Sequence, residues 1–240
     1  MSTPIKTLIR DRGRTPTVPD QTLAAAYRVI AELLLNPDSR DAERVDHESA
    51  ALAAAPAAIR DPIASFLAAP AAADSVEYTQ TLELTPPCPL YLGAYIFDEP
   101  KSCRGAGMSG RNGYMIEIAA VYNHFGVALG GGELADYLPA MVEFLALSLE
   151  AKDRDTIGLR RRFVEQQVLP GLPLLRAALE KYESPYLQLI DALQCVVEND
   201  ALTMFAGPIW VPPPEDGRRP PRPVDAPFEP VNAAIEEARP

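Results

Sequence analysis

The chain has 240 residues, 48% of them hydrophobic, and its 22 basic and 33 acidic side chains give a formal net charge of −11. This length and apolar content suffice for one domain with a buried core. Nucleic acids and anionic membranes repel so acidic a protein, so we exclude both as partners and expect a basic or neutral one.

The two ends of the chain lack the pattern of a core. Residues 1–20 are polar and contain proline, and ten of the 34 residues from Gly207 onward are proline. Such compositions predict a disordered N-terminal arm at 1–20 and a disordered proline-rich tail at 207–240. The chain shows neither a signal-peptide core nor an apolar run near the ~18 residues of a membrane span. We therefore expect a cytoplasmic protein with a single helical domain at 21–206.

Apolar residues at helical spacing predict the first four elements. Asp20 is expected to cap a helix that ends at Asn36-Pro37. Two alanine-rich helices follow at 41–55 and 57–69, and a fourth lies at 75–84. The residues expected to face the core are Leu23, Tyr27, Ile30, Leu34, Leu52, Ile59, Ile63, Phe66, Leu67, Val76, Thr79 or Gln80, and Leu84.

The middle of the chain contains one irregular segment and one long helix. Residues 85–90 are proline-rich, and 91–97 predict a buried connector because no second strand-like segment exists to pair with them. Ser109 is placed to cap a helix that Gly126 ends after Phe125. Its predicted inner face is formed by Met115, Ile118, Tyr122 and Phe125.

Residues 133–145 combine an apolar stripe with acidic flanks. The stripe, continued to 149, consists of Leu134, Leu138, Met141, Val142, Leu145 and Leu149. This spacing predicts an amphipathic helix. Pro139 lies inside the pattern, so we expect a kink or two short helices that meet at the proline.

Further helices are predicted at 154–168 and 173–182, separated by two prolines, and Ser184-Pro185 is a start signal for the last one. The capped helical segments follow one another, and no second strand-like segment lies among them. The sequence therefore predicts an all-α fold with negligible sheet.

Metal binding and catalysis have weak support. Cys88, Cys103 and Cys195 form no C-x-x-C pair, and with His47 and His124 they give no zinc-like spacing, so we interpret the cysteines as free thiols. No sequence pattern of a nucleophile with its base is present. We expect no metal, no cofactor and no catalytic residue.

A glycine-rich loop leaves one alternative open. Gly105 to Gly110 matches G-x-G-x-x-G and precedes a helix. That pattern marks a dinucleotide site only within a strand–helix–strand unit, which is missing here. A nucleotide-binding enzyme or switch that uses this loop remains an alternative hypothesis.

Acidic and aromatic residues on neighbouring predicted helices indicate a binding surface. They are Tyr78, Glu83, Glu117, Tyr122, Asp136, Tyr137 and Glu143. An apolar groove with acidic edges is complementary to a basic, amphipathic peptide. One alternative is that these acids only keep an alanine-rich domain soluble. Another is that the chain is a generic helical protein-interaction module.

The stretch from Glu133 to Leu145 resembles the E-L-P-D-H-L-P-x-x-L-E-[YF]-L signature of the NarJ/TorD family of molybdoenzyme maturation chaperones. It departs from the signature at Ala135 and Tyr137. Glu183-Ser-Pro-Tyr186 resembles the start of the family's last helix, and Tyr78-x-x-x-Leu82-x-Leu84 is a weaker similarity. The glycine-rich insertion and the long tail are more similar to the NarJ branch, which serves nitrate reductase-like enzymes.

The resemblance implies an all-helical, cytoplasmic chaperone without enzymatic activity. Its expected partner is the catalytic subunit of a molybdopterin oxidoreductase. It would bind the N-terminal segment of that subunit, often a twin-arginine signal peptide, and assist molybdenum-cofactor insertion before export. Transferred to this chain, the peptide-binding positions are Glu133, Asp136, Tyr137, Pro139 and Glu143, with Tyr122, Glu117 and Tyr78 added from the surface interpretation.

Overall fold

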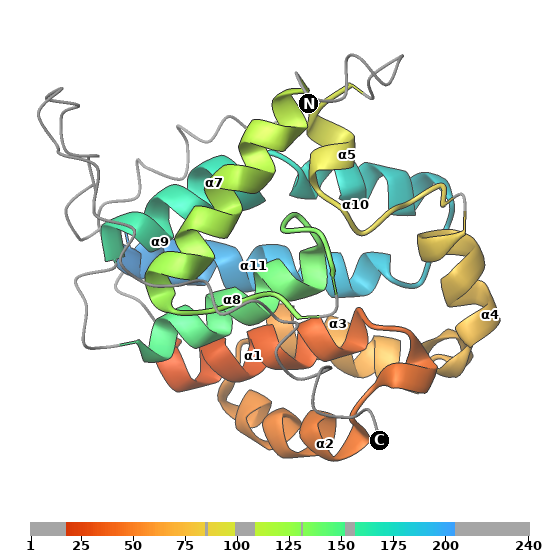
Figure 1. The fold of residues 1–240 in the computed structure, drawn as a ribbon. Helices are drawn as coiled ribbons and strands as arrows, with labels where there is room; N and C mark the ends of the chain where they lie inside the picture. The colour runs from red at the N-terminus through yellow and green to blue at the C-terminus, as the bar shows by residue number, and fades with distance from the viewer. Residues whose placement is uncertain (1–17, 85, 99–108, 131, 152–156, 205–240) are drawn as a thin grey trace, which may run out of the picture. The chain divides into compact units, whose positions relative to one another are not determined.

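The computed structural model describes residues 18–84, 86–98, 109–130, 132–151 and 157–204. The chain divides into the units Met1–Trp210 and Val211–Pro240, and every described residue belongs to the first. The regular elements of the described ranges are helices, which confirms the all-α prediction (Figure 1). The predicted arm and tail lie almost wholly outside these ranges.

The α-helices are α1 (Asp20–Leu33), α2 (Ala42–Ala51), α3 (Ala57–Ala68), α4 (Ser75–Tyr78), α5 (Gly93–Ile96), α7 (Gly110–Phe125), α8 (Leu138–Glu150), α9 (Ile157–Phe163), α10 (Leu172–Lys181) and α11 (Leu187–Met204). Short 3-10 turns are η2 (Pro37–Ser39), η3 (Leu52–Ala54) and η4 (Pro70–Ala73). Two π-helical segments, η5 (Thr79–Glu83) and η6 (Val164–Val168), extend α4 and α9. None of the described helices is both long and apolar enough to cross a bilayer.

Helix α1 lies at the centre of the core, in contact with α2, α8 and α11. The predicted inner face is confirmed, because Leu23, Tyr27 and Ile30 are almost fully buried. The predicted cap is wrong. Pro19 precedes the first turn without a side-chain cap, and Asp20 is already helical, where its charge favours the positive end of the helix dipole.

A buried polar network ties four helices together around the end of α11. The hydroxyl of Tyr27 donates to Asp200 at 2.9 Å, and Nη2 of Arg160 donates to the same carboxylate oxygen at 2.7 Å. Arg160 also donates through Nε to Ser148 Oγ at 2.7 Å. Since all four side chains are buried, this network fixes α1, α8, α9 and α11 relative to one another.

Aromatic rings fill the space between α7, α8 and α9. Phe144 lies 4.8 Å from Tyr122, 5.0 Å from Phe125 and 4.8 Å from Phe163, measured between ring centroids. The prediction that α7 turns Tyr122 and Phe125 inward is therefore confirmed. The ends of α7 also match the prediction, because Ser109 Oγ accepts from the backbone N–H of Arg111 and Gly126 has φ = 75°.

The inner face of residues 75–84 differs from the prediction. Val76 and Leu84 are 64% and 69% exposed, whereas Tyr78 and Leu82 are buried. The hydroxyl of Tyr78 donates to the carbonyl of Leu34 at 3.0 Å, which holds this face against α1. The prediction chose aliphatic side chains over a tyrosine that buries more surface. Leu67 is likewise exposed rather than internal.

The segment 133–145 is a turn followed by a helix. Helix α8 begins at Leu138, and Pro139 occupies its first turn, where a missing N–H costs nothing. The prediction of helix from Glu133, kinked at Pro139 or divided into two short helices there, is therefore wrong, and Leu134 is 43% exposed. The rest of the stripe is confirmed, since Leu138, Met141, Val142 and Leu145 are buried.

Residues 91–97 do find a pairing partner. Tyr91 and Tyr137 form an isolated antiparallel bridge. The backbone N–H of Leu138 donates to the carbonyl oxygen of Leu90 at 2.7 Å, and the backbone N–H of Leu92 donates to the carbonyl oxygen of Asp136 at 3.1 Å. The expectation of an unpaired connector is wrong, because the helix predicted over 133–145 included Tyr137, whose backbone is extended and forms the bridge. This bridge positions the candidate site.

Candidate functional site

Five of the eight predicted site residues line two adjacent hollows, and the other three lie elsewhere. The five are Tyr78, Glu133, Tyr137, Pro139 and Glu143. Asp136 and Tyr122 are buried, and Glu117 lies at a different pocket. Glu133 and Tyr137 belong to both hollows, so the turn before α8 separates the two.

The larger hollow has a volume of about 530 Å³. Its lining is formed by Tyr78, Leu82, Glu83, Pro86, Pro89, Leu90, Tyr91, Ala94, Arg111, Glu133 and Tyr137. The rings of Tyr91 and Tyr137 lie 5.3 Å apart, and the hydroxyl of Tyr91 donates to Glu133 Oε1 at 2.8 Å. The wall thus combines apolar and aromatic side chains with the guanidinium group of Arg111 and the exposed carboxylates of Glu83 and Glu133.

The smaller hollow has a volume of about 260 Å³ and is bordered by α1, α2, α8 and residues 129, 130, 133 and 137. It is lined by Ala31, Glu32, Leu35, Arg44, Leu129, Gly130, Glu133, Tyr137, Pro139, Ala140 and Glu143. Arg44 lies between two carboxylates, donating to Glu32 Oε2 at 3.1 Å and to Glu143 Oε1 at 2.5 Å. The other oxygen of Glu143 is buried and has no hydrogen-bond partner among the described residues.

Asp136 is not the surface acid that the pattern predicts. It is fully buried, and its carboxylate accepts hydrogen bonds from Arg111 Nε at 2.9 Å and from the backbone N–H of Gly93 at 3.1 Å. Because the charge is already paired inside the fold, Asp136 is a support for the turn. Direct contact of Asp136 with a partner is therefore not supported by its position.

Three further residues assigned to the binding surface are also buried, and of these Tyr122 was expected on the inner face of its helix. Tyr122 is buried, with its hydroxyl donating to the carbonyl of Ala135 at 3.2 Å, so it holds the turn from below. Tyr78 and Pro139 are largely buried too and contribute to the walls rather than to the rims. Each side chain turns inward because an aromatic or proline ring buries apolar surface that water would otherwise contact.

Tyrosines of the larger hollow remain protonated at neutral pH. Burial raises the pKa of Tyr137, and burial together with the hydrogen bond to Glu133 raises the pKa of Tyr91. Both rings therefore present an apolar face and a hydroxyl donor rather than a phenolate. This chemistry suits binding of a mixed apolar and cationic segment.

Metal and nucleotide binding gain no support from these residues. In the part of the chain that the structure describes, no three side chains of His, Cys, Asp and Glu are grouped to hold a metal ion. Burial raises the pKa of the Cys88 thiol, which disfavours the thiolate that binds metals. Cys103 and most of the Gly105–Gly110 loop lie outside the described residues.

Sequence reasoning missed the basic residues of the site. Arg44 and Arg111 each pair with an acid that the pattern left unpaired. Tyr91 was placed in the connector and was not selected. The sequence holds no usable signal for Arg111, because this residue of the first turn of α7 meets Asp136 only in three dimensions and no spacing rule reveals it.

Comparison with known proteins identifies one family. The model of the nitrate reductase delta subunit family matches residues 45–191, more than half of the chain. The matched range includes the aromatic pair and the turn that the two hollows share. No curated protein matches the chain.

Proposed function

We propose that this chain, which belongs to the nitrate reductase delta subunit family of molybdoenzyme maturation chaperones, binds the N-terminal segment of a molybdoenzyme catalytic subunit in the two hollows beside Tyr137. The observation that carries this proposal is the pair of adjoining apolar hollows with acidic edges. They meet at the signature turn, at Glu133 and Tyr137.

The charge of the hollows favours a basic partner. Their linings contain the carboxylates of Glu32, Glu83, Glu133 and Glu143, against the guanidinium groups of Arg44 and Arg111. Arg111 is already paired with buried Asp136. Arginine and lysine side chains have apolar stems that pack on hydrophobic walls and charged heads that stay at carboxylates. An amphipathic, basic segment matches both requirements.

The smaller hollow offers a specific place for a cationic head. One oxygen of Glu143 is used by Arg44, while the other is buried and lacks a donor among the described residues. A guanidinium or ammonium group of the partner that entered this hollow would lie near the carboxylates of Glu32, Glu133 and Glu143.

The wider role follows from the family. We infer that the catalytic subunit of a molybdopterin oxidoreductase is the client, that binding occurs in the cytoplasm, and that it keeps the subunit competent for molybdenum-cofactor insertion before export. The chaperone needs no catalytic residue for this role, because occupation of the client's N-terminal segment suffices to delay export.

Tryptophan substitutions that fill each hollow test the proposal. Ala94 lines the larger hollow and Ala140 the smaller one, and both are partly exposed. Calorimetric titration with a peptide of the client's N-terminal segment should show a roughly tenfold or greater loss of affinity in Ala94→Trp and in Ala140→Trp. Ala58→Trp, at an exposed position on α3, is the matched control and should bind like the wild type. If Ala94→Trp and Ala140→Trp both fold and bind the peptide with unchanged affinity, the peptide binds elsewhere on the chaperone.

A further inference from the structure

Arg44 of α2 lies at the acidic side of the smaller hollow. Its Nη1 donates to Glu32 Oε2 on α1 at 3.1 Å, and its Nη2 donates to Glu143 Oε1 on α8 at 2.5 Å. All three residues line the hollow, together with exposed Glu133. The chaperone without its client therefore already holds a guanidinium group where the proposed client segment would place one.

The guanidinium group of Arg44 can leave this position without releasing α2. The Arg44 side chain is 35% exposed, so its head has direct access to water. Other groups attach the start of α2 to α1, since the N–H of Asp41 donates to Glu32 Oε1 at 2.8 Å and the N–H of Arg44 donates to Asp41 Oδ1 at 3.0 Å. Val45, the next residue, is buried and anchors the helix.

The carboxylates of this hollow favour replacement of Arg44 over the addition of a second cation. Only 6% of the Glu32 side chain and 29% of the Glu143 side chain are exposed. Salt screens charges in such positions less than charges on the open surface, so two guanidinium groups beside the same carboxylates repel one another. A guanidinium group that replaced Arg44 would avoid this repulsion and could make both charge-assisted hydrogen bonds itself.

We propose that Arg44 is an internal competitor of the client segment. Its guanidinium group pairs with Glu32 and Glu143 when no client is bound, and it moves into water when an arginine of the client takes its place. This inference rests on the proposed function, because it assigns a regulation to the same hollow. Since displacement of Arg44 offsets much of the electrostatic gain, Arg44 selects segments that also fill the apolar walls.

A short synthetic peptide of alternating arginine and leucine residues is the probe, because it carries the guanidinium groups and apolar side chains of the proposed segment. A matched peptide has citrulline, the uncharged isostere of arginine, in place of each arginine. In calorimetric titration of the full chain, Arg44→Met should bind the arginine peptide roughly fivefold to tenfold more tightly than the wild type. Its affinity for the citrulline peptide should change by no more than about twofold. Arg44→Lys keeps a competing charge and should lose most of the gain.

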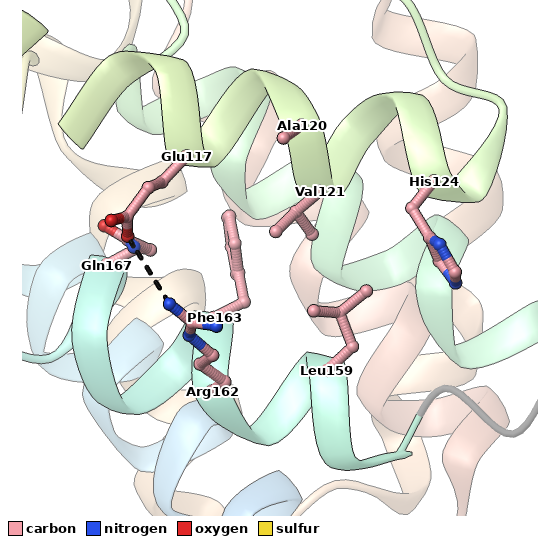
Figure 2. Close-up of a pocket in the computed structure, with 8 residues that line it drawn as sticks. All are labelled: Glu117, Ala120, Val121, His124, Leu159, Arg162, Phe163 and Gln167. Atoms are coloured by element: carbon pink, nitrogen blue, oxygen red, sulfur yellow. Dashed lines mark hydrogen bonds and ion pairs between the residues drawn. The ribbon is translucent and has the colours of Figure 1, made fainter. Parts of the chain in front are cut away.

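Two arginines outside both hollows provide matched controls. Arg162 lies at another pocket, of about 230 Å³ and lined by α7, α9 and η6, with its Nη2 3.9 Å from Glu117 Oε2 (Figure 2). Arg176 donates to Asp191 at 2.7 Å and to Glu180 at 3.1 Å. Their side chains are 32% and 35% exposed, close to the value for the arginine of the hollow. Arg162→Met and Arg176→Met make the same charge change and should bind the arginine peptide within about twofold of the wild type.

Three results would overturn the inference. They are an unchanged or lower affinity of the folded Arg44→Met variant for the arginine peptide, an equal gain in either control variant, and an equal gain for the citrulline peptide. Circular dichroism checks each fold, and Arg44→Gln takes the place of Arg44→Met if the latter does not fold.

The tryptophan variants that fill the hollows separate this inference from the proposed function. If Ala94→Trp and Ala140→Trp weaken binding of the arginine peptide but Arg44→Met does not strengthen it, the peptide binds in the hollows without displacing Arg44, and only this inference fails. If neither tryptophan variant weakens binding, the proposed function fails as well.

Discussion

At the scale of single residues, Asp136 is the anion around which the turn before α8 is built. It accepts from Arg111 and from the backbone N–H of Gly93, and it is fully buried. A Cβ atom at position 93 would collide with the Asp136 carboxylate, so only glycine permits this approach. The hydrogen bond from Gly93 holds residues 91–93 on the turn that the two hollows share, and the bond from Arg111 ties α7 to the same turn.

Asp136→Ala should lower the free energy of unfolding by about 3 kcal/mol, because it leaves Arg111 and the N–H of Gly93 without their acceptor. Glu133→Ala, three residues earlier and exposed, should change it by no more than about 0.5 kcal/mol. Urea unfolding followed by circular dichroism measures both. Equal unfolding midpoints for the two variants would show that Asp136 is solvated like Glu133.

The difference between these two acids limits what the sequence can predict. Glu133 and Asp136 look equivalent in the pattern, and both were assigned to a binding surface. Only Glu133 is exposed, because the position of Asp136 is decided by Arg111 and Gly93, which are distant along the chain. Residue types were therefore predictable at this site, but their partners were not.

Among the helices, the position of Pro139 shows where α8 begins, because proline fits the first turn of a helix but not its interior. It lies in the first turn of α8 and is buried. Pro139→Ala should lower the free energy of unfolding by about 1 kcal/mol, since the unfolded chain gains freedom and some packing is lost. If the helix instead ran through from Glu133, the same substitution would restore a backbone hydrogen bond and stabilise by up to about 3 kcal/mol. Thermal and urea unfolding decide by the sign of the change.

Helical periodicity predicted correctly those helices in which the capping residues and the apolar stripe indicate the same bounds. Helix α7 has both, with Ser109 at one end and Gly126 at the other, and its predicted bounds match. The stripe at 133–149 was read one turn too early because Leu134 shares the spacing of the buried leucines. The π-helical segments were missed because the prediction assumed a regular 3.6-residue period. On α4 and η5 the inner face is formed by Tyr78 and Leu82 rather than by Val76 and Leu84.

At the scale of the whole molecule, buried tyrosines make stability sensitive to alkali. Burial raises the pKa of Tyr27, Tyr122, Tyr78 and Tyr114 above the ordinary value of about 10. Since the folded-state pKa is the higher one, their contribution is complete below pH ~10 and is lost as the pH rises beyond it. Each such tyrosine removes up to about 1.4 kcal/mol per pH unit.

We therefore expect cooperative alkaline unfolding, in which most of the tyrosinate absorbance appears together with the loss of helical circular dichroism. A spectrophotometric titration with parallel circular dichroism measures this. Complete tyrosine ionisation in a chain that keeps its helices would contradict the buried positions.

Part of the chain's excess of acidic side chains lies at the larger hollow. Composition alone predicted a basic partner but gave no location for it. The structure places exposed Glu83 and Glu133 at the larger hollow, whereas Asp136 and Glu143 are already paired with arginines. Charge reversal at the two exposed acids is consequently the cleanest perturbation, since it disturbs no buried ion pair.

Calorimetric titration of the client's N-terminal peptide into the Glu83→Lys, Glu133→Lys double variant measures whether the hollows bind that peptide. The affinity should fall roughly fivefold to thirtyfold, and the salt dependence of binding should weaken, because two attractive charges become repulsive. The control is Asp61→Lys with Glu180→Lys, which makes the same charge change at exposed acids outside both hollows, and it should lose far less. If the Glu83→Lys, Glu133→Lys variant folds and binds the peptide as tightly as the wild type, the peptide does not bind at the larger hollow.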